Sequence, residues 1–512
     1  MTAHTVDVVD SLALLSTKVA SNVFDLSSGM HHVSIRDQMV RAQLAVRDLR
    51  RGDPKFQALL IVGAGVAGIS AALEAVERGV ERVVVVEVEG APFHLLRGVH
   101  SRHVGPYMYE WPSTFCRNQS YPHHKRTTWS DAAVAPLHWA ATEPISASSL
   151  AELLTEDLKS RLEELTLTKP EALTICVGVN RRYVRDFVQE FARVEAARAL
   201  ARLQRRVPIA PVTYGYYNDL QWPWMTPAER VLTPAYVMLA AGMGVEKTLL
   251  ISKNEYDSPY VGPNFLGPRF WAQDSLLEPQ TAKERVAIFG GGDGALQDAL
   301  RALTGREQPL QFMTFLESAP DVRVAIARVM PRLLDADRQG RQFGTWTAKR
   351  NEYRTIDDTC RAIAKELANN VRVVRRVGQG LRQGPGEVTL FVRGGYFDKT
   401  YLLNRFVVHL VEACGRAQKG MWSGRMRLRV KRHHWAVGYS TAPDGQHEVK
   451  IAHPEPPRSL AICTHVCDTI AVRYGIEPGS VPGAQMIQVS DRPSRQRTSL
   501  SRVELPFVAE AD

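Results

Sequence analysis

One stretch constrains the fold of this chain more than any other: residues 58–90 read ALLIVGAGVAGISAALEAVERGVERVVVVEVEG. A short apolar run, typical of a buried parallel strand, precedes Gly63, Gly65 and Gly68 in the spacing G-x-G-x-x-G. The first glycine allows a sharp turn, the second lets backbone approach a diphosphate, and the third lets the following helix pack closely. The stretch therefore predicts a β-α-β unit that holds a dinucleotide diphosphate at a helix N-terminus.

An acid completes this unit. Glu87 ends the second apolar run, RVVVVE, about 20 residues past the glycines, where a carboxylate can accept hydrogen bonds from ribose hydroxyls. Strand, glycines, helix, strand and acid occur in the required order. This order favours a nucleotide site over the alternative, a glycine-rich turn without a ligand.

A second unit begins at Glu284, in ERVAIFGGGDGALQDALRALTG. Its apolar run is followed by Gly290, Gly292 and Ala295 in the spacing G-x-G-x-x-A, and we assign Asp293 and Gly294 to the same cofactor-binding loop. The motif is less specific than the first. A cofactor-like fold with an empty site is its alternative reading.

The run LQFMTFLE, which follows this second helix, is predicted to be the next strand, ending at Glu317. A carboxylate in that place accepts hydrogen bonds from a free 2′-hydroxyl and repels a 2′-phosphate, so it mildly favours NADH over NADPH.

Two dinucleotide units in one chain indicate electron transfer between a flavin and a nicotinamide. With GAGVAGISAA followed by VVVVE, and with GGGDGALQDA, the sequence resembles the two-dinucleotide-domain flavoproteins, the superfamily of thioredoxin reductase, flavin-containing monooxygenases and Baeyer–Villiger monooxygenases. The resemblance implies FAD at the first motif and NADH or NADPH at the second, in a domain nested inside the first.

The expected fold class is α/β, a Rossmann-like FAD-binding domain with a nested Rossmann-like NAD(P)-binding domain and a helical insertion. Small-residue turns after apolar runs, at Gly242 within residues 236–244 and again at 406–416, mark where the nested domain would leave and re-enter. The expected parts are a helical arm (1–56), the FAD domain (57–279) with its insertion (about 147–206), the nested domain (280–420), and a C-terminal part that returns to the FAD domain and ends in a polar tail (421–512).

A long loop, LLRGVHSRHVGPYMYEWPSTFCRNQSYPHHKR, follows the first unit and supplies the candidate catalytic residues. Arg97 and Arg102 could neutralise a diphosphate, because guanidinium groups make paired hydrogen bonds to phosphate oxygens. His100 and His103 could hydrogen-bond the flavin or donate a proton, although solvated or structural histidines are at least as well favoured. The resemblance of PYMYEWPS to an aromatic run in Baeyer–Villiger monooxygenases implies that Trp111 lies near the flavin.

Three other chemistries are disfavoured. His123 and His124 have no carboxylate or cysteine at ligand spacing, so no metal site is predicted. Cys463 and Cys467 form C-x-x-x-C in what reads as a core helix, not the C-x-x-C of a disulfide reductase. The net charge of +10 suits anionic cofactors, and the arginine-rich helix predicted over 181–206 reads better as a solvated face than as a nucleic-acid site.

The sequence shows no signal peptide or membrane span, and its six cysteines fit a reducing cytoplasm. We therefore expect a cytoplasmic FAD enzyme that is reduced by NAD(P)H and acts on a small, possibly aromatic organic substrate, most favourably as a monooxygenase that uses molecular oxygen. The aromatic segment 213–230 is expected either to line the substrate pocket or to fill a domain seam. The open alternatives are a flavin reductase or oxidase with another acceptor, and a non-catalytic flavin- or nucleotide-sensing protein.

Overall fold

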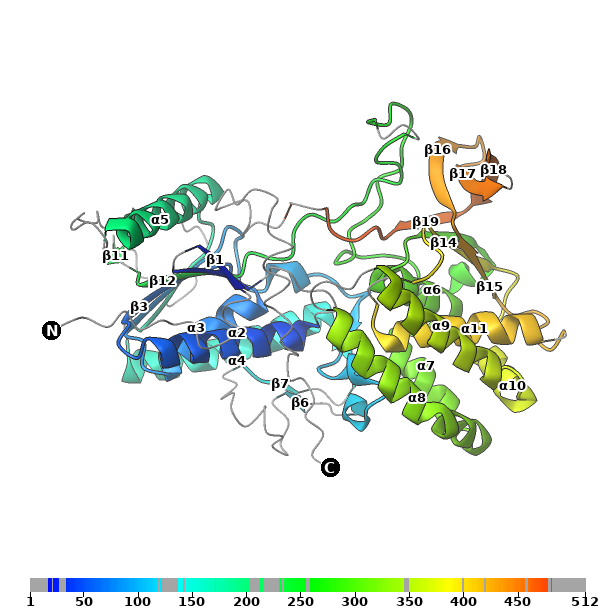
Figure 1. Cartoon of the computed structure of the whole chain (residues 1–512), viewed down its shortest axis with the longest axis horizontal. Coiled ribbons are helices and arrows are strands. Elements are labelled where there is room, and N and C mark those ends of the chain that lie inside the picture. Colours follow the sequence, from blue (N-terminus) through cyan, green and yellow to red (C-terminus); the bar gives the residue numbers. More distant parts are fainter. Residues whose placement is uncertain are drawn as a thin grey trace.

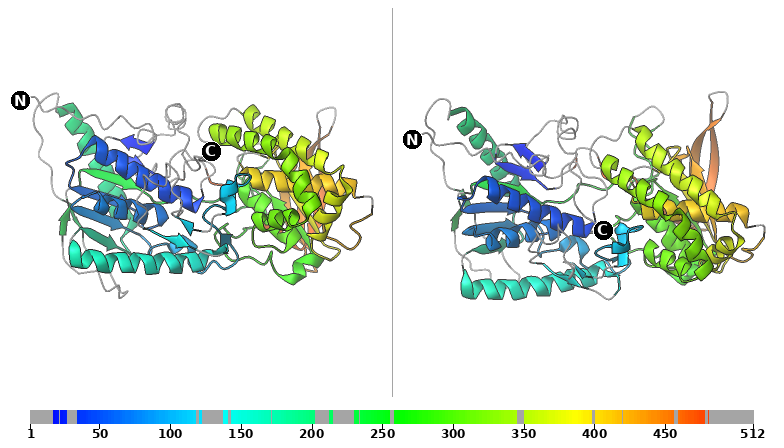
Figure 2. Two further views of the ribbon diagram at one scale, coloured as in Figure 1. Left: turned by 90° about the horizontal axis from the view of Figure 1, so that it is seen from below. Right: turned by 60° about the horizontal axis from the view of Figure 1, so that its bottom comes forward.

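The protein has two domains that lie side by side along its long axis (Figure 1), and Figure 2 shows the same pair from two further directions. The computed structural model describes residues 17–20, 22–26, 34–117, 120–121, 137–140, 143–170, 172–201, 212–214, 230–232, 234–254, 258–344, 350–397, 400–418, 420–455, 459–477 and 480.

The first domain is built on a six-stranded sheet in the order β1-β2-β12-β3-β4-β9, parallel except for β1. Its strands are β1 (Lys18–Ala20), β2 (Val23–Asp25), β3 (Ala58–Val62), β4 (Arg82–Val86), β9 (Leu173–Cys176) and β12 (Tyr236–Leu239). Both faces of the strands are apolar because both are covered by helices, as a parallel sheet requires. One face packs on α2 (Ile35–Gly52), α3 (Val66–Glu77) and α4 (Ala147–Thr168), and the other on α5 (Arg181–Ala201) (Figure 1).

The predicted helix ahead of the first strand is α2. Ser34 and Asp37 begin it with a reciprocal capping box, in which each side chain accepts a hydrogen bond from the other residue's backbone N–H. The start of α2 points toward the domain junction, and Ser34 lines the cavity described below. The N-terminal arm is therefore part of the site's wall.

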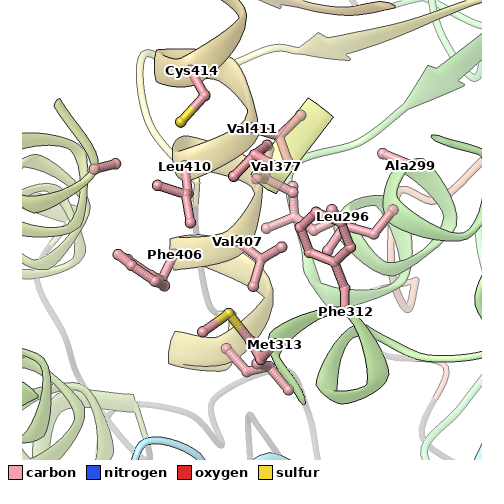
Figure 3. Close-up of a cluster of buried hydrophobic side chains, with 14 of the residues drawn as sticks. Leu296, Ala299, Phe312, Met313, Val377, Phe406, Val407, Leu410, Val411 and Cys414 are labelled. Carbon is pink, nitrogen blue, oxygen red and sulfur yellow. The ribbon is translucent and has the colours of Figure 1, made fainter. Parts of the chain in front are cut away.

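The second domain has a four-stranded parallel sheet in the order β15-β14-β13-β19. Its strands are β13 (Arg285–Phe289), β14 (Glu387–Val392), β15 (Arg427–Arg432) and β19 (Thr469–Val472). The apolar core lies between one face of this sheet and six helices, and Figure 3 shows the part of it formed by Leu296, Phe312, Phe406 and their neighbours. The helices are α6 (Asp293–Thr304), α7 (Pro309–Glu317), α8 (Pro320–Gly344), α9 (Arg350–Leu367), α10 (Val371–Gln379) and α11 (Leu402–Ala417).

An antiparallel sheet covers the other face of the second domain. It consists of β16 (Trp435–Thr441), β17 (His447–Glu455) and β18 (Ser459–Cys467), and its apolar side packs on Phe289 and Phe391. The short strands elsewhere are β5 (His103–Val104) paired with β8 (Ile145–Ser146), β6 (Ser120–Tyr121) paired with β7 (Trp139–Ala140), and β10 (Val212–Tyr214) paired with β11 (Arg230–Leu232).

The two parallel sheets repeat one topology. The four strands that follow one another from β3 and from β13 lie in the order fourth, first, second, third: β12-β3-β4-β9 in the first domain and β19-β13-β14-β15 in the second. The first three of these strands have the order of one half of a doubly wound dinucleotide-binding fold, and the fourth adds the next strand beside the first. The predicted fold class, α/β with two Rossmann-like domains, is confirmed.

Three predicted elements are wrong in the second domain. Residues 310–317 are not a strand but helix α7, which begins with Pro309 at its first turn and buries Phe312, Met313 and Leu316 at helical spacing. The strand that follows α6 in the sheet is instead β14. Glu317 consequently lies at the end of a helix, 3.4 Å from Arg117.

The predicted re-entry strand, 406–416, belongs to helix α11. Phe406, Leu410 and Cys414 recur every four residues and are fully buried, which is a helical pattern. The turn that corresponds to 240–242 of the first domain follows β19, at residues 473–475.

The predicted core helix around Cys463 and Cys467 is also wrong, because these residues lie on strand β18. Cys463 is exposed and stands opposite Ile451 of β17, whereas Cys467 is buried. In the first domain, the two helices of the expected insertion are α4 and α5, and between them runs β9, an unexpected third parallel strand.

Candidate nucleotide-binding cavity

A cavity of about 2560 Å³ lies between the two domains and is lined by both glycine loops. Pockets for one small molecule usually measure roughly 300–1,000 Å³. The cavity therefore has room for more than one nucleotide-sized ligand.

The first loop requires its glycines. Gly63 has φ +106°, its N–H donates to the carbonyl of Val86 at 2.7 Å, and a Cβ there would clash with the carbonyl of Ala240. A Cβ on Gly68 would clash with the carbonyl of Gly63. Gly65 differs, because a Cβ there would meet no atom within 4 Å, and it begins α3 with no side-chain cap from any described residue. The open side of this loop and the uncapped N–H groups of α3 face the cavity.

Glu87 supports the first loop from the end of β4. Its Oε2 accepts from the N–H of Ala64 at 2.7 Å, and its Oε1 accepts from the N–H of Glu89 at 2.9 Å. Both bonds orient the carboxylate beside the loop, and Glu87 lines the cavity.

The second loop repeats this geometry. Gly290 has φ +143°, its N–H donates to the carbonyl of Phe391 at 3.0 Å, and a Cβ there would clash with the carbonyl of Arg473. Gly292 begins α6 in extended backbone, without a side-chain cap from the described residues and with open space on its Cβ side. The third position is Ala295, which is fully buried.

Asp293 distinguishes the second loop, because it places a carboxylate in the first turn of α6. Its Oδ1 accepts from the N–H of Tyr401 at 2.8 Å and from the side-chain amide of Asn404 at 2.9 Å. The carboxylate is thus turned toward the start of α11. A Cβ on Gly294, the next residue, would lie 3.1 Å from the ring of Phe270, so this ring packs closely against the loop.

Arg393 was missed by the sequence analysis. It directly follows β14 and lines the cavity, with its guanidinium 5.8 Å from the ring centroid of Trp435. In the strand register, Val392 corresponds to Glu87 of the first domain, and Arg393 is the next residue along the chain. A signal was present in the sequence, because the apolar run VTLFV directly precedes Arg393. This run ends at Val392, 75 residues after Glu317, the end of the run that was predicted to be the strand.

Of the loop residues assigned catalytic or phosphate-binding roles, Arg97 and His103 line the cavity. Arg97 donates through Nε to the carbonyl of Pro92 and through Nη2 to Thr155, both at 2.9 Å. His103 Nε2 lies 3.4 Å from the carboxylate of Glu307, and burial lowers the pKa of this histidine.

His100 and Arg102 are placed differently. His100 is exposed, donates its backbone N–H to Gln273 at 3.1 Å, and is not among the described residues that line the cavity. Arg102 reaches the cavity wall, but its guanidinium is buried in ion pairs with Asp298 and Asp274.

The structure does not place Trp111 at the cavity. Its side chain is buried in the core of the second domain and stacks on Phe406 with ring centroids 5.3 Å apart. Tyr109 of this loop region does reach the cavity. It stacks on Tyr401, the residue before α11, with ring centroids 4.1 Å apart, and Tyr401 lines the cavity as well. Burial and the nearby Asp293 carboxylate raise the pKa of Tyr109, so its phenol stays protonated at neutral pH.

Gly242 follows β12 with φ +92°, and a Cβ there would meet no atom within 4 Å. It lines the same cavity as the two glycine loops. His123, His124 and most of the aromatic segment, residues 215–229, lie outside the described residues.

Within the described ranges, no group of three or more histidine, cysteine, aspartate or glutamate side chains could hold a metal ion. No helix in the part of the chain that the structure describes is long and apolar enough to cross a membrane.

Residues 58–247 match the family model of the FAD dependent oxidoreductases. The matched segment contains the first glycine loop, Glu87 and Gly242, and this confirms the resemblance drawn from the first motif. A comparison with curated protein sequences finds no match.

Among solved structures, the chain is similar to the lysine monooxygenase NbtG from Nocardia farcinica, with 12% identity, 82% of this chain and 81% of that chain covered, and a TM-score of 0.29. It is similar to the ornithine N-hydroxylase KtzI from Kutzneria sp. 744, with 11% identity, coverage of 84% and 83%, and a TM-score of 0.32. A thioredoxin reductase from Gloeobacter violaceus gives 11% identity, coverage of 88% and 94%, and a TM-score of 0.21. These TM-scores are too low to support an inference about function, so the function is argued from the residues of this chain.

The family match places an FAD-dependent oxidoreductase domain over residues 58–247 of this chain. The parallel sheet of the second domain repeats the strand order found in the first.

Proposed function

We propose that this protein is an FAD enzyme that is reduced by a nicotinamide dinucleotide and passes the electrons to oxygen and a small organic substrate. The observation that carries the proposal is that two glycine loops, each leading into a helix without a side-chain cap, face one cavity. A helix N-terminus of this kind favours a diphosphate, because its N–H groups and dipole both attract negative charge.

The residues present fit these two cofactors. Gly63, Gly65 and Gly68 would hold the FAD diphosphate, and Glu87 would accept hydrogen bonds from the ribose next to it. Gly290 and Gly292 would hold the second diphosphate in the same way. When bound, the two cofactors would supply the transfer of a hydride, with its two electrons, from the nicotinamide to the flavin.

We further propose that the second nucleotide is NADPH, in place of the NADH that Glu317 favoured. Arg393, not Glu317, follows the strand next to the second glycine loop, one residue beyond Val392, which corresponds to Glu87. In this fold an arginine near that position accommodates a 2′-phosphate. A guanidinium there attracts a 2′-phosphate by paired, charge-assisted hydrogen bonds.

The oxygenase assignment is supported by an apolar, aromatic part of the cavity wall. Phe93, Met108 and Trp139 are buried side chains that line the cavity, as does the stacked pair Tyr109–Tyr401. Such a wall excludes water and suits a small organic substrate, and His103 is a cavity residue able to exchange a proton.

Anaerobic and aerobic spectroscopy of the FAD-loaded protein tests the proposal. We expect bound flavin to lose its absorbance on mixing with NADPH without oxygen, and oxygenated product to form with oxygen and a panel of amines, sulfides, ketones and aromatic acids. Bleaching without oxygenated product would instead indicate a reductase or oxidase, and bound flavin that NADPH does not reduce would indicate a sensor.

A further inference from the structure

A buried cluster of five charged side chains lies directly behind the second glycine loop, where four segments of the chain meet. Asp298 and Arg301 are on α6, Arg473 follows β19, Asp274 lies in the linker that precedes β13, and Arg102 comes from the first domain. Their side chains are 0–8% exposed. Buried charges are uncommon unless they are paired, so this cluster marks a junction that the fold holds in one geometry.

Asp298 is the centre of the cluster. It receives Arg473 Nε at 2.8 Å and Arg301 Nη1 at 3.0 Å, and it makes the closest ion pair with Arg102. Asp274 receives Arg102 Nη2 and Arg301 Nη1, both at 2.9 Å. Burial by itself raises the pKa of Asp298, but the three arginines outweigh it and hold that pKa well below its usual range, so the aspartate stays ionised.

Arg102 is the member that ties the first domain to this cluster. Its carbonyl accepts from the N–H of Ala147, the first residue of α4, at 2.7 Å, and the next two residues form β5. Its guanidinium also lies 4.1 Å from the ring centroid of Phe270, the residue that packs behind Gly294. One side chain therefore links α4 of the first domain to the glycine loop of the second.

We propose that Arg102 is a positioning residue that holds the second nucleotide site at a fixed place relative to the first domain, and so sets the approach of the two cofactors. The proposal rests on the proposed function. It replaces the phosphate-binding role predicted for Arg102, because Nε donates to the carbonyl of Phe270 and the two Nη atoms pair with Asp298 and Asp274.

Arg102 can be removed without leaving an unbalanced charge. Without it, Arg301 and Arg473 remain beside Asp274 and Asp298, two positive and two negative groups. The Arg102→Met variant should therefore keep the second domain folded while losing the ion pairs of Arg102 with this cluster. The bond from Arg301 Nη2 to the carbonyl of Ser101, at 2.6 Å, would remain. Arg117→Met, an exposed arginine in the same loop region, is the matched control.

The first test compares two reductants of the FAD-loaded protein in anaerobic stopped-flow measurements. We expect saturating NADPH to reduce the flavin of R102M roughly 10- to 100-fold more slowly than that of the unchanged protein, because small displacements of reacting groups cost rates of this order. Reduction by 1-benzyl-1,4-dihydronicotinamide should change less than about twofold, since this donor has no diphosphate and does not need the second site. Equal losses with both donors, or no loss with either, would overturn the proposal.

The second test needs no cofactor. Limited proteolysis of the cofactor-free R102M protein should cut the linker, residues 241–279, faster than in R117M and in the unchanged protein. Unchanged cleavage would contradict the positioning role. If NADPH fails to reduce even the unchanged protein, the proposed function falls, and the proteolysis result still decides whether Arg102 holds the domains together.

Discussion

In both domains a glycine with positive φ follows the first strand of the unit and packs against the residue after β12 or β19. Its N–H donates to Val86, the last residue of β4, in the first domain and to Phe391, the last but one residue of β14, in the second. What differs is the charge around the loop. The first loop has Val66 at the first helical residue and Glu87 directly after Val86, whereas the second has Asp293 at the first helical residue and Arg393 two residues after Phe391. Under the proposed function, the shared backbone would hold a diphosphate in either domain, and the side chains around it would decide which nucleotide fits.

The largest expected effect comes from closing the first loop. Gly65 has space for a side chain and an ordinary backbone conformation, so Gly65→Val should fold but should keep the diphosphate away from the N–H groups of α3. We expect FAD affinity to fall at least roughly 100-fold, which corresponds to about 2.8 kcal/mol. Flavin absorbance after gel filtration and titration with FAD measure this. If a folded G65V protein retained its FAD in full, the first glycine loop would not be the site that holds the FAD diphosphate.

The matched change in the second loop is Gly292→Val. The geometry is the same, with open space and extended backbone, so the variant should fold and keep its FAD. Its dissociation constant for NADPH should rise at least roughly tenfold, or about 1.4 kcal/mol. Loss of FAD from G292V, or unchanged NADPH binding, would show that the two loops do not serve separate nucleotides.

Arg393→Ala sharpens the contrast in charge. Removing the guanidinium should lower kcat/KM for NADPH roughly 10- to 100-fold, the range expected for charge-assisted bonds of about 1.5–3 kcal/mol to a phosphate, and leave NADH nearly unaffected. Arg427→Ala on β15, an exposed arginine away from the cavity-lining residues, is the control. Equal losses with both coenzymes would mean that Arg393 does not read the 2′-phosphate.

The smallest effect is expected at Glu317, which lies at the end of a helix. Glu317→Gln should change the ratio of kcat/KM values for NADPH and NADH less than about twofold, because the residue pairs with Arg117 and is not among the described cavity-lining residues. Steady-state kinetics with the two coenzymes check this. A marked rise in this ratio in favour of NADPH would mean that Glu317 does contact the second nucleotide.

Sequence reasoning succeeded where the signal is local. The first glycine loop, its strands and Glu87 lie within one short stretch, and each part has its own residue requirement, so all were predicted in place. It failed for the second strand of the second domain, because four helices, α7 to α10, separate α6 from β14. The apolar residues of α7 then stood where a strand was expected, and Arg393 was overlooked.

The roles of single side chains in the loop after β4 were harder to predict. Arg102, His103 and Trp111 are close in sequence, yet they enter an ion-pair cluster, the cavity wall and the core of the second domain respectively. Nothing in a non-periodic segment specifies which partner each side chain meets, because the partners come from the other domain.

The long excursion between β13 and β14 also bears on the order in which the two halves fold. The bond that closes the first loop joins residues 63 and 86, whereas its counterpart joins 290 and 391. Contacts between distant parts of a chain form more slowly, and domains made earlier during synthesis fold first. The first glycine loop can therefore form on the ribosome while the second domain is still being translated. The second domain would then fold against a first domain that is already folded.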